Sequence, residues 1–244
     1  MNKIKGITDN DYQLLKEKYD NLEPIIEKLN NNYPVQYLIG NVSFYGYNIN
    51  VDERVLIPRF ETEYLVEKTI NLMKKKNILN SKVLEVGTGS GCISIALKKE
   101  IPTLNITAID ISNDSLNVAK NNALENNVDI KFLNEDLFNY KPQEKYDILI
   151  SNPPYIGYGE IIDPKTKYEP QNALYAEDSG MKYYKYMIDN YESFLNDKFI
   201  MAFEIGYLQG ESLLEYTKEK LPKSIAYIEK DLSGKDRYLF IINE

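Results

Sequence analysis

The fold is decided by one stretch, Lys82-Val83-Leu84-Glu85-Val86 followed directly by Gly87-Thr88-Gly89-Ser90-Gly91. The first five residues are mostly apolar and predict a short buried strand, and Cys92 to Glu100 predicts the helix that follows. Glycines allow a sharp turn and a close approach of the backbone to a ligand. In α/β proteins, ligands bind beyond the carboxyl ends of such strands. The stretch therefore predicts a ligand-binding turn at the edge of a sheet.

Strands and helices alternate after this turn. Strands are predicted at 105–109, 130–133, 146–151 and 199–205, and helices at 115–126, 183–195 and 209–220. This order predicts an α/β fold, with a mostly parallel sheet covered by helices on both faces. Two closing strands, 224–230 and 237–242, would complete seven strands and place an antiparallel strand in the edge region.

The residues before this domain predict smaller elements. Asp9 to Asn30 has helical periodicity, and Pro24 is placed to begin a second helix. Residues 41–57 suggest a β-hairpin around Gly46, and Thr62 to Met73 has one apolar helix face. We therefore expect a short helical N-terminal segment over 1–32, a linker and hairpin over 33–60, and the main domain over 61–244.

The amino-acid composition excludes several kinds of functional site and binding partner. The 244 residues carry a net charge of −8, which argues against strong sequence-independent binding to nucleic acid. Cys92 is the one cysteine, so no internal disulfide forms, and the lack of histidine excludes His triads and His metal sites. Met1 to Asn10 is polar, and no apolar run is long enough to span a bilayer. We expect a cytoplasmic protein with no bound metal and no membrane contact.

A carboxylate accompanies the glycine turn. The next strand ends in Asp110, about 20 residues beyond the turn, where an acid can bind the hydroxyls of a ribose. The spacing Gly87-x-Gly89-x-Gly91 is tighter than the dinucleotide fingerprint, and no lysine is present for a Walker motif. It is similar to the S-adenosylmethionine loop of class I methyltransferases. The competing interpretation is a tight turn that binds nothing.

The most specific motif is Asn152-Pro153-Pro154-Tyr155, which follows the apolar strand Asp147 to Ser151. The prolines end the strand and fix the direction of the Asn152 side chain and the Pro153 carbonyl. Both oxygens can accept the hydrogens of an amide or amine nitrogen, while Tyr155 packs on the planar group and covers the methylsulfonium. We therefore assign catalysis to Asn152, Pro153 and Tyr155. The alternative is an Asn-Pro turn that only ends a strand.

From about Tyr33 onward, the sequence resembles the HemK/PrmC family of release factor glutamine methyltransferases. The stretches that match are Pro34–Gly40, Val55–Glu63, Gly87–Cys92, Asp110–Ser112, Asp136–Phe138, Ser151–Ile156, Glu169–Pro170, Glu204–Gly206 and Gly234–Arg237. The sequence departs from the family at Phe60, where proline is usual, and at Ser179, where aspartate is usual. Its helical segment before Tyr33 is also short.

The resemblance implies a class I, Rossmann-like methyltransferase domain that uses S-adenosylmethionine. Gly87 to Gly91 would bind the methionine part of the cofactor, Asp110 the ribose, and Leu137 the adenine. Glu85, Ile111, Asp136 and Asn152 are also assigned to the cofactor site. The substrate would be the glutamine of the Gly-Gly-Gln loop in class I release factors, held by Asn152 to Tyr155 with Arg59 and Glu61.

Three rival functions stay open. A ribosomal-protein glutamine methyltransferase would use the same chemistry. An adenine-amino nucleic acid methyltransferase faces the same geometric problem after base flipping, although the acidic charge opposes it. A non-catalytic module that binds a nucleoside is the third. For a release factor partner, with no direct nucleic acid contact, we expect docking by Asp9 to Asn30 and by Ile156 to Gly180, a long irregular loop.

Overall fold

A computed structural model describes residues 7–160 and 163–244, and its core is a seven-stranded sheet in the order β10-β11-β9-β6-β3-β4-β5. All neighbours are parallel except β11, which is antiparallel to both β9 and β10. The strands are β3 Lys82–Val86, β4 Asn105–Asp110, β5 Lys131–Asn134, β6 Tyr146–Ser151, β9 Leu195–Glu204, β10 Ile225–Lys230 and β11 Asp236–Asn243. The predicted α/β fold with an antiparallel strand near the edge is confirmed.

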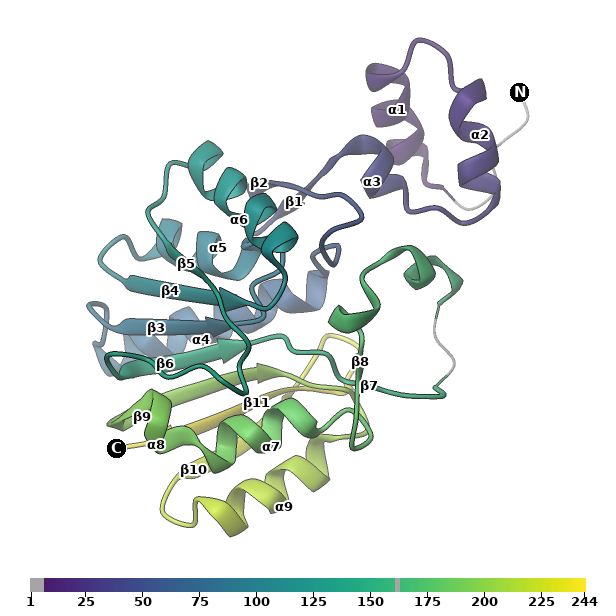
Figure 1. Ribbon diagram of the computed structural model, residues 1–244. Coiled ribbons are helices and arrows are strands. Elements are labelled where there is room, and N and C mark those ends of the chain that lie inside the picture. The colour runs from purple at the N-terminus through teal and green to yellow at the C-terminus, as the bar shows by residue number, and fades with distance from the viewer. Residues whose placement is uncertain (1–6, 161–162) are drawn as a thin grey trace.

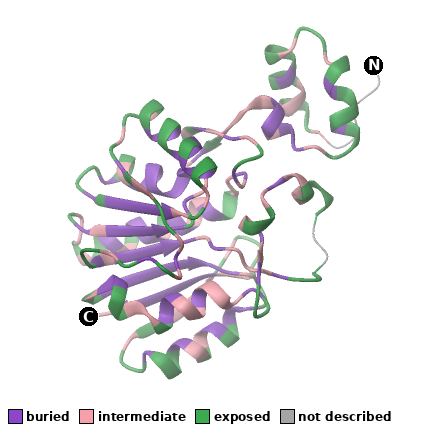
Figure 2. Cartoon of the chain, viewed as in Figure 1, coloured by how far each residue is buried: buried purple, intermediate pink, exposed green. Residues whose placement is uncertain are grey.

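Helices cover both faces of the sheet (Figure 1). One face carries α4 Phe60–Lys76, α5 Cys92–Glu100 and α6 Asn113–Glu125, and the other carries α7 Lys182–Asp189, α8 Tyr191–Phe194 and α9 Gly210–Lys220. Side chains of a strand alternate between the faces. In β6, Ile148 and Ile150 join the first core, whereas Leu149 joins the second. Figure 2 shows the resulting buried strands between helices with exposed outer faces.

One helix boundary was predicted wrongly. The expected single helix over 183–195 is two helices, α7 and α8, with a break at Asn190. The Asn190 backbone N–H and the side-chain Nδ2 both donate to the Tyr186 carbonyl, which ends α7. Leu195 already belongs to β9, so this strand begins earlier than predicted.

The N-terminal part forms a small core of its own. It contains α1 Asp9–Lys18 and α2 Glu23–Asn30, and Pro24 stands in the first turn of α2 as predicted. A further helix, α3 Val35–Ile39, was not predicted. The buried side chains of this small core are Leu15, Ile25, Leu29, Val35 and Leu38. The core thus extends past residue 32, while residues 1–6 of the predicted segment lie outside the described residues.

A β-hairpin connects this part to the sheet. It consists of β1 Asn41–Phe44 and β2 Tyr47–Asn50, as the sequence predicted. The side chain of Asn122 in α6 binds three backbone groups of two residues: Oδ1 accepts from the Asn50 N–H, and Nδ2 donates to the carbonyls of Asn50 and Ser90. The hairpin is therefore tied to the glycine turn through α6.

The segment after β6 is more ordered than predicted. The expected irregular loop contains two short parallel strands, β7 Ile156–Gly157 and β8 Tyr175–Ala176. Between them lie two 3-10 helices, η1 Pro164–Tyr168 and η2 Gln171–Ala173. This segment and the N-terminal helices both lie beyond the carboxyl ends of the sheet strands (Figure 1). Across residues 7–160 and 163–244, every helix is too short or too polar to cross a membrane.

Candidate active site

The backbone of the glycine turn, Gly87 to Gly91, borders an open space. The N–H groups of Gly87 and Thr88 donate to the Ile109 carbonyl at 2.9 and 3.1 Å, which binds the turn to the end of β4. Gly87 and Gly89 have φ values of +72° and +55°, and in the described part of the chain no atom beyond their chain neighbours lies within 4 Å of where a Cβ would stand. A side chain at either position would be strained and would fill this space.

Asp110 faces this turn from the end of β4. Its carboxylate accepts the Gly89 N–H at 2.9 Å and the Ser112 N–H at 2.8 Å. Burial raises the pKa of Asp110, while the two backbone hydrogen bonds oppose that shift. Each oxygen keeps a lone pair that these bonds do not use. The carboxylate is therefore fixed in position and can accept further hydrogen bonds.

The turn and Asp110 form part of one cavity, here called the inner cavity. The predicted cofactor residues that line it are Gly87, Gly89, Asp110, Ile111, Asp136, Leu137 and Asn152. Four predicted residues lie behind its wall instead: Glu85, Thr88, Ser90 and Gly91. Glu85, Thr88 and Ser90 are buried among protein atoms, so direct contact by their side chains would require the wall to move.

Glu85 has unused hydrogen-bonding capacity. Its Oε2 accepts hydrogen bonds from the hydroxyls of Thr88 and Ser94. Its Oε1 is the one buried side-chain oxygen or nitrogen without a partner in the described part of the chain. Burial raises the pKa of Glu85 to about 7. An acid with an unpaired buried oxygen behind a bare glycine turn suits a cationic ligand.

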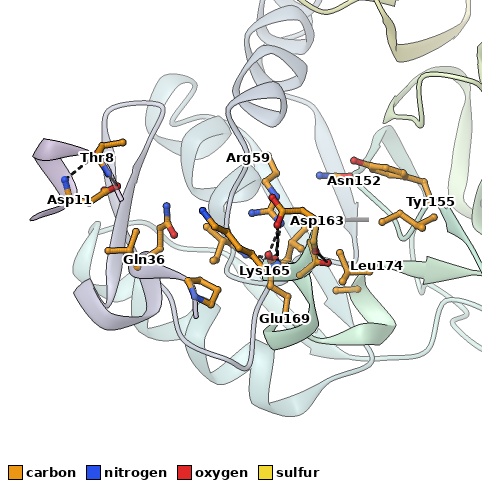
Figure 3. Close-up of a pocket in the computed structure, with 17 residues that line it drawn as sticks. Thr8, Asp11, Gln36, Arg59, Asn152, Tyr155, Asp163, Lys165, Glu169 and Leu174 are labelled. Carbon is orange, nitrogen blue, oxygen red and sulfur yellow. Dashed lines mark hydrogen bonds and ion pairs between the residues drawn. The ribbon is translucent and has the colours of Figure 1, made fainter. Parts of the chain in front are cut away.

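A second cavity, the outer cavity, adjoins the first. Its volume is about 560 Å³, and Asn152, Leu56 and Ala173 line both cavities. Figure 3 shows Asn152 and Tyr155 at one end, Thr8, Asp11 and Gln36 at the other, and Arg59 with Glu169 between them. The Asn152 side chain thus stands where two cavities of different character meet.

Asn152 is oriented by a buried chain of hydrogen bonds. Its Nδ2 donates to Thr62 Oγ1 at 3.1 Å, and the Thr62 hydroxyl donates to Glu204 Oε2 at 2.6 Å. The Tyr155 hydroxyl donates to the other carboxylate oxygen of Glu204 at 3.5 Å. Pro153, one of the predicted catalytic residues, is buried and lines neither cavity, whereas Pro154 lines the inner one.

Of the two other predicted substrate residues, one reaches the site. Arg59 lines the outer cavity, but its guanidinium is paired with Glu169 at 2.6 Å. Glu61 is exposed and lines neither cavity, because it lies on the outer side of the first turn of α4. Its assignment to substrate binding therefore has no support in the structure. The Glu61 carbonyl instead accepts the Tyr238 hydroxyl at 2.8 Å.

The sequence did not reveal several residues that shape the site. Thr62, Glu204 and Glu169 stand within the family-like stretches, but no role was assigned to them. Thr62 and Glu204 are 142 positions apart, so no local spacing pointed to their contact. Only their burial in the structure points to a role for these residues, because a buried acid or hydroxyl needs a hydrogen-bond partner.

Comparison with known proteins shows the family of the chain. Residues 62–163 match the family model of the methyltransferase small domain. The chain is 39% identical to the release factor glutamine methyltransferase of Enterococcus faecalis, over 92% of this chain and 81% of that protein. It is 37% identical to the Lactococcus lactis protein of the same name, over 96% and 84%.

Solved structures agree on the fold. The ribosomal protein L11 methylase of Lactobacillus delbrueckii superposes with a TM-score of 0.58 at 22% identity, over 80% of this chain and 85% of that one. Identity this low supports the fold alone. Identity above 30% over more than two thirds of both chains is the stronger finding, and by it the protein belongs to the family of release factor glutamine methyltransferases.

Proposed function

We propose that the protein transfers a methyl group from S-adenosylmethionine to the side-chain amide nitrogen of a glutamine, in the Gly-Gly-Gln loop of a class I release factor. The observation that carries this proposal is the place of Asn152, between a cofactor-like cavity and a larger open one. The names of the Enterococcus and Lactococcus relatives support the choice of substrate.

The inner cavity has the chemistry that S-adenosylmethionine requires. Asp110 would accept the ribose hydroxyls, and Leu137 and Ile111 would pack beside the adenine. The bare backbone at Gly87 and Gly89 leaves room for the methionine part, and the acidic groups suit its positive charge. When bound, the cofactor supplies an electrophilic methyl group. Glu85, which was also assigned to the cofactor site, would influence the cofactor from behind the glycine turn.

The residues after β6 would prepare the nitrogen. An amide nitrogen is a poor nucleophile because its lone pair is delocalised into the carbonyl. Asn152 Oδ1 and the Pro153 carbonyl would accept its two hydrogens and hold it in line with the methyl carbon. As positive charge builds on the nitrogen, these hydrogen bonds strengthen and stabilise the transition state. Once the nitrogen has taken the methyl group it would be strongly acidic and would release one proton to water, so no histidine or other strong base is needed.

The outer cavity suits a protein loop. Its volume of about 560 Å³ is in the range of ligand-binding cavities, and its wall joins the N-terminal helices to the segment after β6. A glutamine on an extended loop would enter here and reach Asn152. The acidic net charge of −8 disfavours a nucleic acid substrate, whose phosphates it would repel.

Methyl transfer from labelled S-adenosylmethionine tests the proposal, with release factor, ribosomal protein and DNA offered in parallel. Label should enter the release factor glutamine. In Asn152→Ala, turnover should fall about 100-fold or more, because the lost hydrogen bonds act in the transition state. Cofactor affinity should stay within about twofold of wild type.

Asn121→Ala is the matched control, because Asn121 is an exposed asparagine on α6 that lines neither cavity. It should behave as wild type. Preferential labelling of DNA or of the ribosomal protein would reject the proposed substrate. Turnover of Asn152→Ala within a few-fold of wild type would reject the mechanism.

A further inference from the structure

A buried carboxylate lies directly beside the motif that ends β6. Glu204 is the last residue of β9, which pairs in parallel with β6, and Ser151 is in register with Phe203. Glu204, at the end of β9, therefore lies at the same level as Asn152, the first residue after β6. Glu204 is 1% exposed.

This carboxylate contacts the catalytic motif twice. Thr62 links it to Asn152, and the Tyr155 hydroxyl donates to it directly. Its own backbone carbonyl accepts the Tyr184 hydroxyl at 2.7 Å, which anchors the end of β9. The charged groups near enough to affect the pKa of this carboxylate are Arg237 and Arg59, which lower it, and Glu61, which raises it.

We propose that Thr62 and Glu204 are positioning residues for methyl transfer, which hold the Asn152 amide with Oδ1 toward the substrate. The inference rests on the proposed role of Asn152 as the acceptor of the substrate amide. It explains why Asn152 Oδ1 points toward the substrate.

The direction follows from which groups can donate. At a pH above its pKa of about 7, the Glu204 carboxylate only accepts, so the Thr62 hydroxyl must give its single hydrogen to Glu204. Thr62 Oγ1 can then only accept from Asn152, and this requires Nδ2 on that side. Oδ1 is left on the opposite side of the amide. A rotation of 180° would exchange the two groups and present a donor to the substrate's own N–H groups.

A structural role explains this carboxylate poorly. Burying a charge costs stability unless an ion pair compensates it. Among the described residues, no lysine or arginine nitrogen lies within 4 Å of the Glu204 carboxylate. Arg237 instead donates to Asp231 and to the Ile205 carbonyl. A neutral side chain would be cheaper to bury here, so the charge is better explained by its effect on Thr62.

Replacement of the Thr62 hydroxyl tests the relay. Thr62→Val keeps the shape and removes the hydrogen bonds, so kcat should fall 10- to 100-fold, with KM for the release factor and cofactor affinity within twofold. Thr62→Ser keeps the hydroxyl and should recover kcat to within threefold of wild type. Thr69→Val is the matched control: Thr69 is buried in the same helix, but its hydroxyl donates to the Leu65 carbonyl. Its kcat should stay within twofold.

A double-mutant comparison shows whether Thr62 acts through Asn152. In an Asn152→Ala background, Thr62→Val should change kcat less than twofold, because the acceptor is already gone. Multiplicative losses would overturn the proposal, as would a kcat of Thr62→Val within twofold of wild type. Glu204→Gln is the second variant: it should lower kcat while the protein stays folded, and a kcat equal to wild type would also overturn the relay.

A measurement without turnover separates this inference from the proposed function. In ¹⁵N NMR of the full chain, the Asn152 side-chain NH₂ should be protected from hydrogen exchange in the wild type and lose that protection in Thr62→Val. This result would support the relay even if no release factor were methylated. Equal, fast exchange in both proteins would overturn the relay while leaving the methyltransferase activity standing.

Discussion

The guanidinium of Arg59 donates to both carboxylate oxygens of Glu169 at 2.6 and 2.9 Å, across 110 positions of sequence. The Ile57 N–H donates to the same carboxylate at 3.3 Å. The Glu169 side chain is 2% exposed and that of Arg59 is 34% exposed. The pair joins the segment before α4 to the segment between η1 and η2, and both residues line the outer cavity. It therefore holds one wall of the outer cavity in place.

We predict that Glu169→Gln loosens this wall. The free energy of unfolding should fall by about 1–3 kcal/mol, as expected when a buried charged hydrogen-bonding group is lost. KM for the protein substrate should rise. Urea denaturation and steady-state kinetics measure the two effects. Glu144→Gln is the control, because solvent screens the exposed pair of Glu144 with Lys82 and its loss should change stability much less. Equal losses in the two variants would contradict the prediction.

Asp110 should control cofactor affinity. Asp110→Ala removes the proposed acceptor for the ribose hydroxyls and also frees the Gly89 N–H from its present bond. Charge-assisted hydrogen bonds contribute about 1.5–3 kcal/mol, so affinity for S-adenosylmethionine should fall by about 10-fold or more. Titration calorimetry measures this directly. Unchanged affinity would exclude Asp110 from the cofactor site.

Gly180 should be needed because it packs against Tyr155, and not only because of its left-handed backbone conformation. A Cβ at Gly180 would lie 2.0 Å from the Tyr155 carbonyl oxygen, and φ is +81°. Gly180→Ala should therefore displace Tyr155, with kcat at least tenfold lower. Gly159→Ala is the control: its φ is +94°, but among the described residues no atom beyond its chain neighbours lies within 4 Å of where a Cβ would stand. Both variants carry backbone strain, so similar kcat values would show that the contact with Tyr155 is unimportant.

The pH dependence of stability should report Glu204. Burial raises its pKa from 4.5 to about 7, so the folded protein binds this proton more tightly than the unfolded chain. The stabilising effect is complete below about pH 4.5 and is lost as pH rises through about 7. Between pH 5 and 8, the free energy of unfolding of Glu204→Gln should therefore gain about 3 kcal/mol relative to wild type. Urea denaturation across this range measures it, and parallel curves would contradict the assignment.

The N-terminal helices should dock the partner. Thr8 and Asp11 line the outer cavity, and Lys18 and Tyr19 donate to the carbonyls of Ile39 and Leu38. Deletion of residues 1–30 should leave cofactor binding intact and abolish methylation of the intact release factor. A free loop peptide should be a poor substrate for both forms. Equal rates for the full-length and truncated proteins would show that this segment does not dock the partner.

The fold was predictable where local signals agree. The strand at 82–86 and the helix at 92–100 were predicted to the residue, because an apolar run, a glycine turn and a helical pattern follow one another. The helix at 35–39 was not predicted, because five residues are too few to show a helical period. The break at Asn190 was also missed, since nothing in the helical pattern marks it.

Some residues of the site could be predicted from the sequence and others could not. Gly87, Asp110 and Asn152 stand at strand ends, where chain order alone places functional groups, and the structure brings all three to one cavity. Contacts between segments that are far apart in the sequence could not be predicted from strand order. Thr62 meets Glu204 only because α4 packs on the sheet beside β9, and Arg59 meets Glu169 only through the folded segment after β6. Such pairs depend on tertiary packing rather than on sequence spacing.

The separate core around Leu15, Ile25 and Leu29 has a consequence for cooperativity. These side chains pack with Val35 and Leu38 and not with the two cores of the sheet. A unit with so few buried contacts opens at a lower free energy than the sheet does. The outer cavity would then lose a wall while the inner cavity stays folded. We therefore expect heating to unfold the protein in two steps rather than one, with substrate binding at the outer cavity lost before the cofactor is released.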